Sequence, residues 1–153
     1  MRRELFLTAL VVTSIIPAAV AALVDWRAHR VPDSLVILTL APVVLAVVVA
    51  DEPTRRLVAV AAGAGLMALP LLLVHVVAPA AMGFGDVKLA LALGAALGVI
   101  APELTVPALA AGAGTTLLVA SCTRRVAMPF APGLVAGAAT ALAFGPLEGW
   151  KVA

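Results

Sequence analysis

Six long apolar stretches, separated by short polar or proline-containing breaks, dominate this sequence of 153 residues. A helix needs about 20 mostly apolar residues to cross about 30 Å of hydrocarbon, and each stretch comes near that length. The stretches cover residues 5–24, 34–50, 57–78, 87–101, 103–122 and 133–149. We therefore predict an all-α, polytopic membrane protein with about six transmembrane helices, folded as a single membrane-embedded domain over residues 1–153.

The composition argues against a soluble fold. Residues of the apolar set AVILMFWYC make up 64% of the chain and charged residues only 12%, against about half and about a quarter in ordinary soluble domains. The 10 lysines and arginines barely exceed the 8 acids, and no basic run matches a phosphate backbone, so we expect no nucleic-acid partner. One cysteine and two distant histidines predict no metal centre, and no cofactor is expected.

Two regions of the sequence leave an alternative open. Met1–Arg3, the apolar run after it and the small residues Ala19–Ala21 also resemble a secretory signal peptide, although the run exceeds the usual 7–15 residues. Pro102 and Glu103 alone separate the fourth stretch from the fifth, so this region is either two helices or one kinked or re-entrant segment.

Charge bias does not orient the predicted helices. The positive-inside rule counts lysine and arginine in the connections, and with six helices the two sides of the membrane carry equal numbers of them. One side receives Arg2, Arg3, Arg55, Arg56 and Lys151, and the other receives Arg27, Arg30, Lys88, Arg124 and Arg125.

Two aspartates lie at helix ends on the same predicted side of the membrane. Asp25 directly follows the first stretch and Asp86 directly precedes the fourth, so each carboxylate lies at the edge of the hydrocarbon, where an unpaired charge is costly. Two carboxylates brought close together share one proton, and such a pair can activate water for attack on a peptide carbonyl. We therefore predict Asp25 and Asp86 as a catalytic pair, although a helix N-terminus alone would also explain Asp86.

The residues around Asp86 add to this prediction. Gly83 and Gly85 permit positive φ and close backbone approach, so we expect them to make room beside Asp86 for the partner acid or a peptide strand. Lys88 is predicted to place positive charge near the pair or to bind an acidic group of the substrate. The alternative is a lysine that extends from the helix end to the membrane surface.

Other unusual residues are assigned to structure. Arg27 and Arg30 are expected to bind lipid phosphate, and His75 to have a structural partner between helices. The small residues at 63–65, 94–98 and 110–114 predict close packing of helices.

Three sequence blocks, in this order, resemble the type IV prepilin peptidase family, membrane aspartic proteases of the GxGD kind. The blocks are DWRAHRVPDSL at 25–35, MGFGDVKLALALG at 82–94 and MPFAPGLVAG at 128–137. The resemblance implies a six-helix protease of the plasma membrane that removes the short basic leader of pilin-like precursors. It implies that Asp25 and Asp86 are the catalytic aspartates, that they face the cytoplasm and that the N-terminus lies outside.

This sequence departs from the family pattern in three respects. Asp33 stands where the family usually has asparagine, and we expect it to cap the second helix as asparagine would. Ala131 stands where the usual PFGP has glycine, which leaves the shape of that loop open. The bifunctional members carry paired CxxC motifs, whereas this chain has only Cys122, so we expect the compact form without methyl transfer.

Two other classes of function remain as alternatives. A small transporter would use Asp25, Asp86 and Lys88 as an ion or proton relay, but its acids are expected nearer mid-span, beside discontinuous helices. A non-catalytic assembly subunit of a secretion system would depend on neither acid.

Overall fold

The computed structural model describes residues 2–28, 30–80, 82–123 and 129–144, with the side chains from residue 5 onward. These residues form six α-helices and one 3₁₀ turn, and they contain no strand. The elements are α1 (Arg2–Ala28), α2 (Asp33–Val48), α3 (Pro53–Val77), α4 (Phe84–Ile100), η1 (Pro102–Leu104), α5 (Thr105–Thr123) and α6 (Ala131–Phe144). One helix corresponds to each predicted stretch, so the all-α prediction is confirmed. Residues 145–149 of the last stretch lie outside the described residues.

Three segments are long and apolar enough to cross a membrane: Leu5–Ala28, Pro53–Val77 and Pro102–Thr123. The helices α2 and α6 are also apolar but have only 16 and 14 residues. Many large apolar side chains lie exposed on the outer faces of the bundle, which suits hydrocarbon as the solvent. The chain is therefore an all-α membrane protein.

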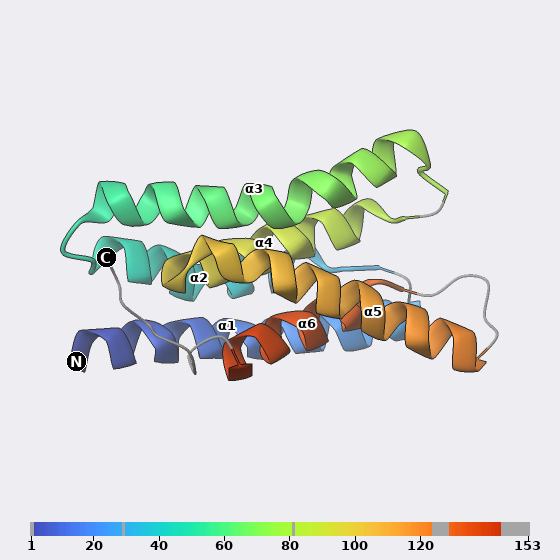
Figure 1. Cartoon of the computed structure of the whole chain (residues 1–153), viewed down its shortest axis with the longest axis horizontal. Coiled ribbons are helices and arrows are strands. Elements are labelled where there is room, and N and C mark those ends of the chain that lie inside the picture. Colours follow the sequence, from blue (N-terminus) through green and yellow to red (C-terminus); the bar gives the residue numbers. More distant parts are fainter. Residues whose placement is uncertain (1, 29, 81, 124–128, 145–153) are drawn as a thin grey trace.

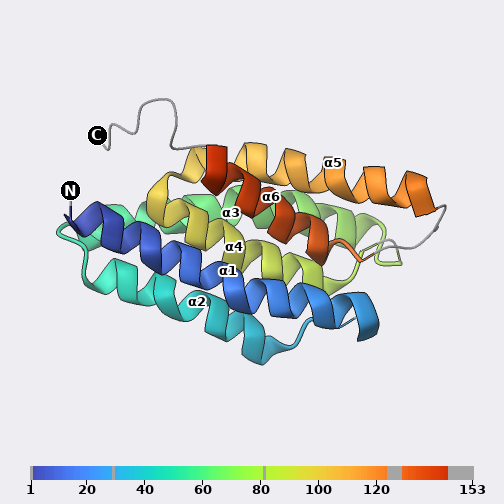
Figure 2. The same cartoon turned by 90° about the horizontal axis from the view of Figure 1, so that it is seen from below.

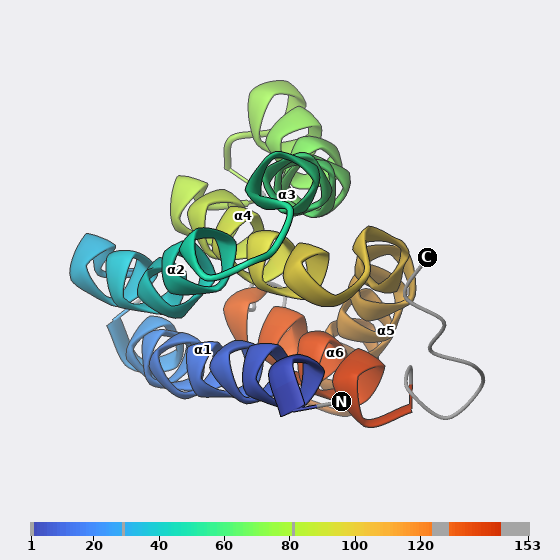
Figure 3. The same cartoon turned by 90° about the vertical axis from the view of Figure 1, so that its left-hand side faces the viewer.

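The six helices run roughly lengthwise, and α4 lies in the middle of the bundle (Figures 1 and 3). Every residue of α4 from Ala92 to Val99 is buried. Figure 2 shows α1 alongside α2, and α5 on the outside against α6. Val11, Ala18 and Ala21 of α1 are buried in the apolar core, so α1 is an integral helix of this bundle.

Glycines allow α3 and α4 to pack with their backbones almost in contact. A Cβ added at Gly98 would lie 2.9 Å from Cα of Val60, and one at Gly94 would lie 2.8 Å from Cβ of Met67. The same close packing joins α5 to α6, where a Cβ at Gly112 would lie 2.8 Å from the carbonyl oxygen of Gly133. The predicted role of small residues in packing is confirmed at these positions.

The break between α4 and α5 is a compact turn. Thr105 Oγ1 donates a hydrogen bond of 2.6 Å to the carbonyl oxygen of Pro102, so η1 separates two distinct helices. Nearby, the guanidinium of Arg56 donates to the carbonyl oxygen of Val99, which otherwise has no partner within the helix because it lies in the last turn of α4. The carbonyl oxygens of Val99 and Pro102 at this end of the bundle therefore have side-chain donors within the protein.

Candidate active site

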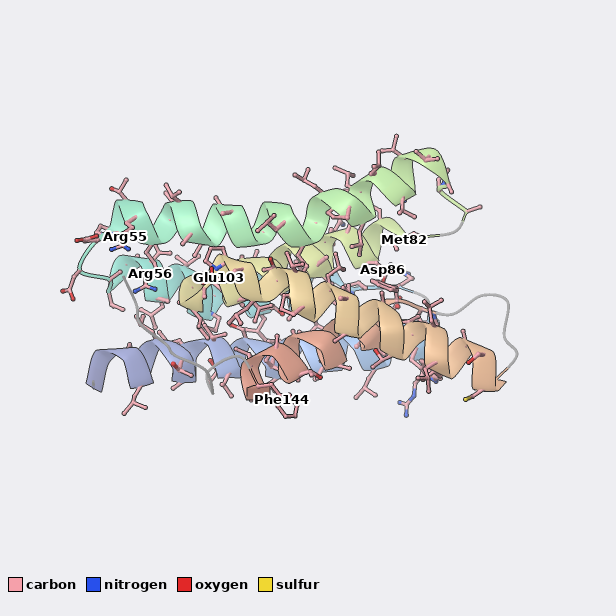
Figure 4. All side chains as sticks on the ribbon, in the orientation of Figure 1. Arg55, Arg56, Met82, Asp86, Glu103 and Phe144 are labelled. Carbon is pink, nitrogen blue, oxygen red and sulfur yellow. The ribbon has the colours of Figure 1, made fainter. Side chains whose placement is uncertain are left out.

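The described parts of all three sequence blocks meet at one end of the bundle. The end of α1, the start of α2 and the start of α4 all lie toward the same end, as does the start of α6 (Figures 1 and 2). Figure 4 shows Asp86 and Met82 far along the bundle from Arg55 and Arg56. The predicted site residues therefore lie at the opposite end of the bundle from Arg56.

Asp25 and Asp86 line the same cavity, whose volume is about 260 Å³. Asp25 lies in the last turn of α1 and is 6% exposed, and Asp86 lies in the first turn of α4 and is 7% exposed. The two carboxylates are close enough to interact electrostatically. The structure therefore brings together two buried acids that are far apart in the sequence, and an ordinary surface role explains neither.

The third sequence block supplies partners for Asp86. The backbone N–H groups of Phe130 and Ala131, where α6 begins, donate hydrogen bonds to the Asp86 carboxylate. Its Oδ1 atom is buried and has no hydrogen-bond partner among the described residues. Ala131 acts here through its backbone, so the alanine in place of the family's glycine retains this donor. The residues at 124–128, including the first residue of this block, lie outside the described residues.

The predicted role of the glycines is correct only in part. Gly83 has φ −72° and ψ 146°, and no described glycine has a positive φ, so the expectation of positive φ is wrong. Gly83 is also uncrowded, since the nearest atom to an added Cβ would be 4.0 Å away. Gly85 is different, because its Cβ would lie only 3.0 Å from Cβ of Val31. Close approach is therefore needed at Gly85, within α4, and brings Val31 to the cavity wall.

Lys88, near the start of α4, forms an ion pair with Asp33, at the start of α2. Lys88 Nζ donates to Asp33 Oδ1 at 2.6 Å and lies 5.3 Å from the centre of the Phe84 ring. The predicted N-cap role of Asp33 is wrong: Pro32 occupies the N-cap position, and Asp33 is the first residue of the helix. Its carboxylate pairs with Lys88, which lines the cavity.

His75 fixes the connection that leads into α4. Its Nδ1 atom lies 2.8 Å from the carbonyl oxygen of Met82, and its ring centre lies 5.5 Å from that of Phe84. His75 therefore has a structural partner, as predicted. It holds the backbone just before Gly83 and so helps to place the first turn of α4.

Arg30 lines the cavity with the two aspartates, a position that the sequence did not predict. Its binding to lipid phosphate stays a prediction. The only available sequence signal was its position five residues after Asp25, in the same block. Arg27, by contrast, is exposed and is not among the residues that line this cavity.

A comparison with known protein families matches residues 12–123 to the type IV leader peptidase family. The chain belongs to this family. The matched region contains both Asp25 and Asp86, and it ends before the block at 128–137. No curated protein and no solved structure matches the chain. As a member of the type IV leader peptidase family, the chain is a peptidase, and the suspected relationship to prepilin peptidases is confirmed.

Proposed function

We propose that this chain is an aspartic endopeptidase that removes the leader of type IV pilin-like or Flp-type precursors, with Asp25 and Asp86 as its catalytic pair. The observation that carries the proposal is the meeting of these two buried acids in one cavity. Membership of the type IV leader peptidase family supports a leader peptide as the substrate. The substrates would be membrane-bound precursors whose apolar helix lies in the bilayer.

The proposed mechanism needs one proton shared between the two aspartates. The ionised carboxylate removes a proton from a water molecule as the water oxygen attacks the peptide carbonyl carbon, and the other carboxylic acid protonates the carbonyl oxygen. The tetrahedral intermediate then collapses. The C–N bond breaks, the amine nitrogen receives a proton from one aspartate, and the hydroxyl proton returns to the other. The backbone N–H groups of Phe130 and Ala131 would hold Asp86 in position during this exchange.

The position of the acids favours a peptidase over a transporter. Asp25 and Asp86 lie within a turn of helix ends at one end of the bundle, whereas a relay across the membrane is expected to place acids near mid-span. The first turn of α4 is continuous, with no broken helix at Asp86. A cavity at the end of a bundle suits a peptide bond just outside the bilayer.

Single substitutions of the acids test the proposal. We expect Asp25→Asn and Asp86→Asn each to lower leader removal by at least about a hundredfold, because each removes one partner of the acid–base exchange. Leader removal is measured as a gel shift on co-expression with candidate pilin-like precursors, with thermal unfolding in detergent to verify folding. A chelator is expected to leave activity unchanged. Wild-type cleavage by either folded variant would refute the catalytic pair.

We also propose that the cavity faces the cytoplasm in the plasma membrane, as the family resemblance implies. Single cysteines at Ala28 and Ala80 would then be shielded from an impermeant thiol reagent added to intact cells, in a Cys122→Ser background. A cysteine at Thr54, at the start of α3, would be labelled. The reverse labelling pattern would place the cavity outside and separate it from a cytoplasmic leader.

A further inference from the structure

The central helix α4 is exposed along one narrow side. Phe84, Lys88 and Leu91 follow one another at intervals of four and three residues, so they lie on the same side of the helix. All three are at least partly exposed, whereas Ala92 to Val99 are buried without exception. We refer to Phe84, Lys88 and Leu91 as the α4 stripe.

The α4 stripe ends abruptly one turn after Leu91. Leu91 is 44% exposed, but Ala95, on the same side of the helix, is only 3% exposed. The reason is the arrangement of the two helices on either side. Figure 3 shows α2 and α3 close together at the turn that joins them, around residues 49–52, and far apart at the start of α4. The stripe is therefore covered at one end and open at the end that carries Asp86.

Both flanks of the stripe are apolar below the ion pair. Asp33 contacts Lys88, which places that face of α2 beside the stripe, and Ile37, one turn further along the same face, is exposed. On α3, Met67 is fully buried against Gly94, but Val74, two turns further on the same side, is 43% exposed. The charged member of the stripe, Lys88, is therefore paired with Asp33, and the side chains beyond this pair are apolar.

The stripe is continuous with the cavity that holds the two aspartates. Phe84 and Lys88 belong to both. From Phe84 to Leu91 the stripe extends about 10 Å along α4, which is about two helical turns. A peptide whose scissile bond lies at Asp25 and Asp86 would meet Phe84 and the Lys88–Asp33 ion pair close to that bond, and apolar side chains beyond the ion pair.

We propose that the α4 stripe is the docking site for the first two turns of the precursor's apolar helix. This inference rests on the proposed function and names the surface that positions the substrate for it. The match is one of position and polarity: an apolar helix that begins beside the cut bond can lie against Phe84 and, beyond the Lys88–Asp33 pair, against Leu91 and Ile37. The closed end at Ala95 sets how far along α4 the docked helix makes contact before it leaves the protein for lipid.

Site-specific photocrosslinking tests this proposal. A benzophenone-bearing residue is placed at Leu91 in the Asp86→Asn variant, which holds the precursor uncut, and the precursor is co-expressed. The matched control carries the same residue at Leu117 on α5, which is 71% exposed but lies on another helix. We expect at least about tenfold more crosslinked precursor from Leu91, because docking raises the local concentration of the substrate helix at one face. A probe at Ile37 should behave like the probe at Leu91.

The attachment point on the precursor gives the second readout. Mass spectrometry is expected to find crosslinks within the first two turns of its apolar helix. Equal yields from Leu91 and Leu117, or crosslinks from Leu91 and Ile37 only to lipid or to a second copy of this chain, would overturn the docking site. Such a failure, combined with leader removal by the wild-type protein, would leave the proposed function intact. Absence of leader removal by the wild type would refute the proposed function itself.

Discussion

The two ends of α4 have opposite surroundings. At its C-terminal end, Gly94 and Gly98 pack against the backbone of α3, and Arg56 donates to the carbonyl oxygen of Val99. At its N-terminal end, α2 and α3 have diverged (Figure 3), a cavity opens, and Asp86 Oδ1 is buried with no hydrogen-bond partner among the described residues. Glycine packing and a carbonyl oxygen with a side-chain donor are found at the closed end, and a buried carboxylate oxygen without a partner among the described residues is found at the open end.

This contrast shows how a small bundle keeps a reactive pair in place. Backbone contact between α3 and α4 fixes the axis of α4 through many short-range contacts, which can be stable in lipid without large side chains. Burying an acid at the open end lowers the stability of the fold. The tight packing at the closed end offsets this loss. The comparison predicts that substitutions at the closed end reduce stability, and that substitutions at the open end reduce activity.

The largest effect on stability is expected from Gly94→Ala at the closed end. The new methyl would lie 2.8 Å from Cβ of Met67, so the α3–α4 interface must open, at a cost of about 1–3 kcal/mol. Thermal unfolding in detergent measures the loss, and turnover per folded molecule should stay at the wild-type value. Gly114→Ala is the control, because no atom lies within 4 Å of its new Cβ. A destabilisation as large in Gly114→Ala would refute packing as the cause.

An intermediate effect, on activity, is expected from Gly85→Val at the open end. The added side chain would displace Val31, which lines the cavity. We expect turnover to fall by about tenfold, equivalent to about 1.4 kcal/mol of transition-state stabilisation, with little change in thermal stability. Gly83→Ala is the matched control, since it has an ordinary φ and open space around it. Equal loss of activity in Gly83→Ala and Gly85→Val would show that contact with Val31 does not cause the loss of activity.

The smallest effect is expected from Asp33→Asn. The Asp33 side chain is largely exposed although it pairs with Lys88, and exposed pairs contribute about 1 kcal/mol or less. Thermal unfolding and leader cleavage should both stay close to wild type. A loss of activity as large as that of Gly85→Val would mean that cleavage depends on the Asp33–Lys88 ion pair as much as on the shape of the cavity.

The helices of this fold could be predicted from the sequence because each helix must meet a simple physical requirement. A membrane-spanning helix must be apolar along its length, and the breaks between the stretches carry prolines and charges that lipid excludes. The parity of six helices then placed Asp25 and Asp86 on one side. The structure agrees with that placement and brings the two acids into one cavity.

Other features of the site could not be predicted, because they depend on tertiary contacts or on the backbone. The donors of Phe130 and Ala131 to Asp86 are main-chain N–H groups, which any residue except proline would offer. The contact of Gly85 with Val31 and the pairing of Asp33 with Lys88 join segments that only folding brings together. The N-cap prediction for Asp33 failed because that long-range partner was not visible in the local sequence.

The central claim is that Asp25 and Asp86 act as one catalytic unit, and a double-mutant comparison tests it most directly. Single-turnover cleavage of a precursor is measured for wild type, Asp25→Asn, Asp86→Asn and the double variant, each normalised to folded protein. Groups that act as a unit are strongly non-additive. We therefore predict that the double variant cleaves at about the rate of the slower single variant. A double variant slowed by the product of the two single effects would show that the two acids act independently, and would contradict this account.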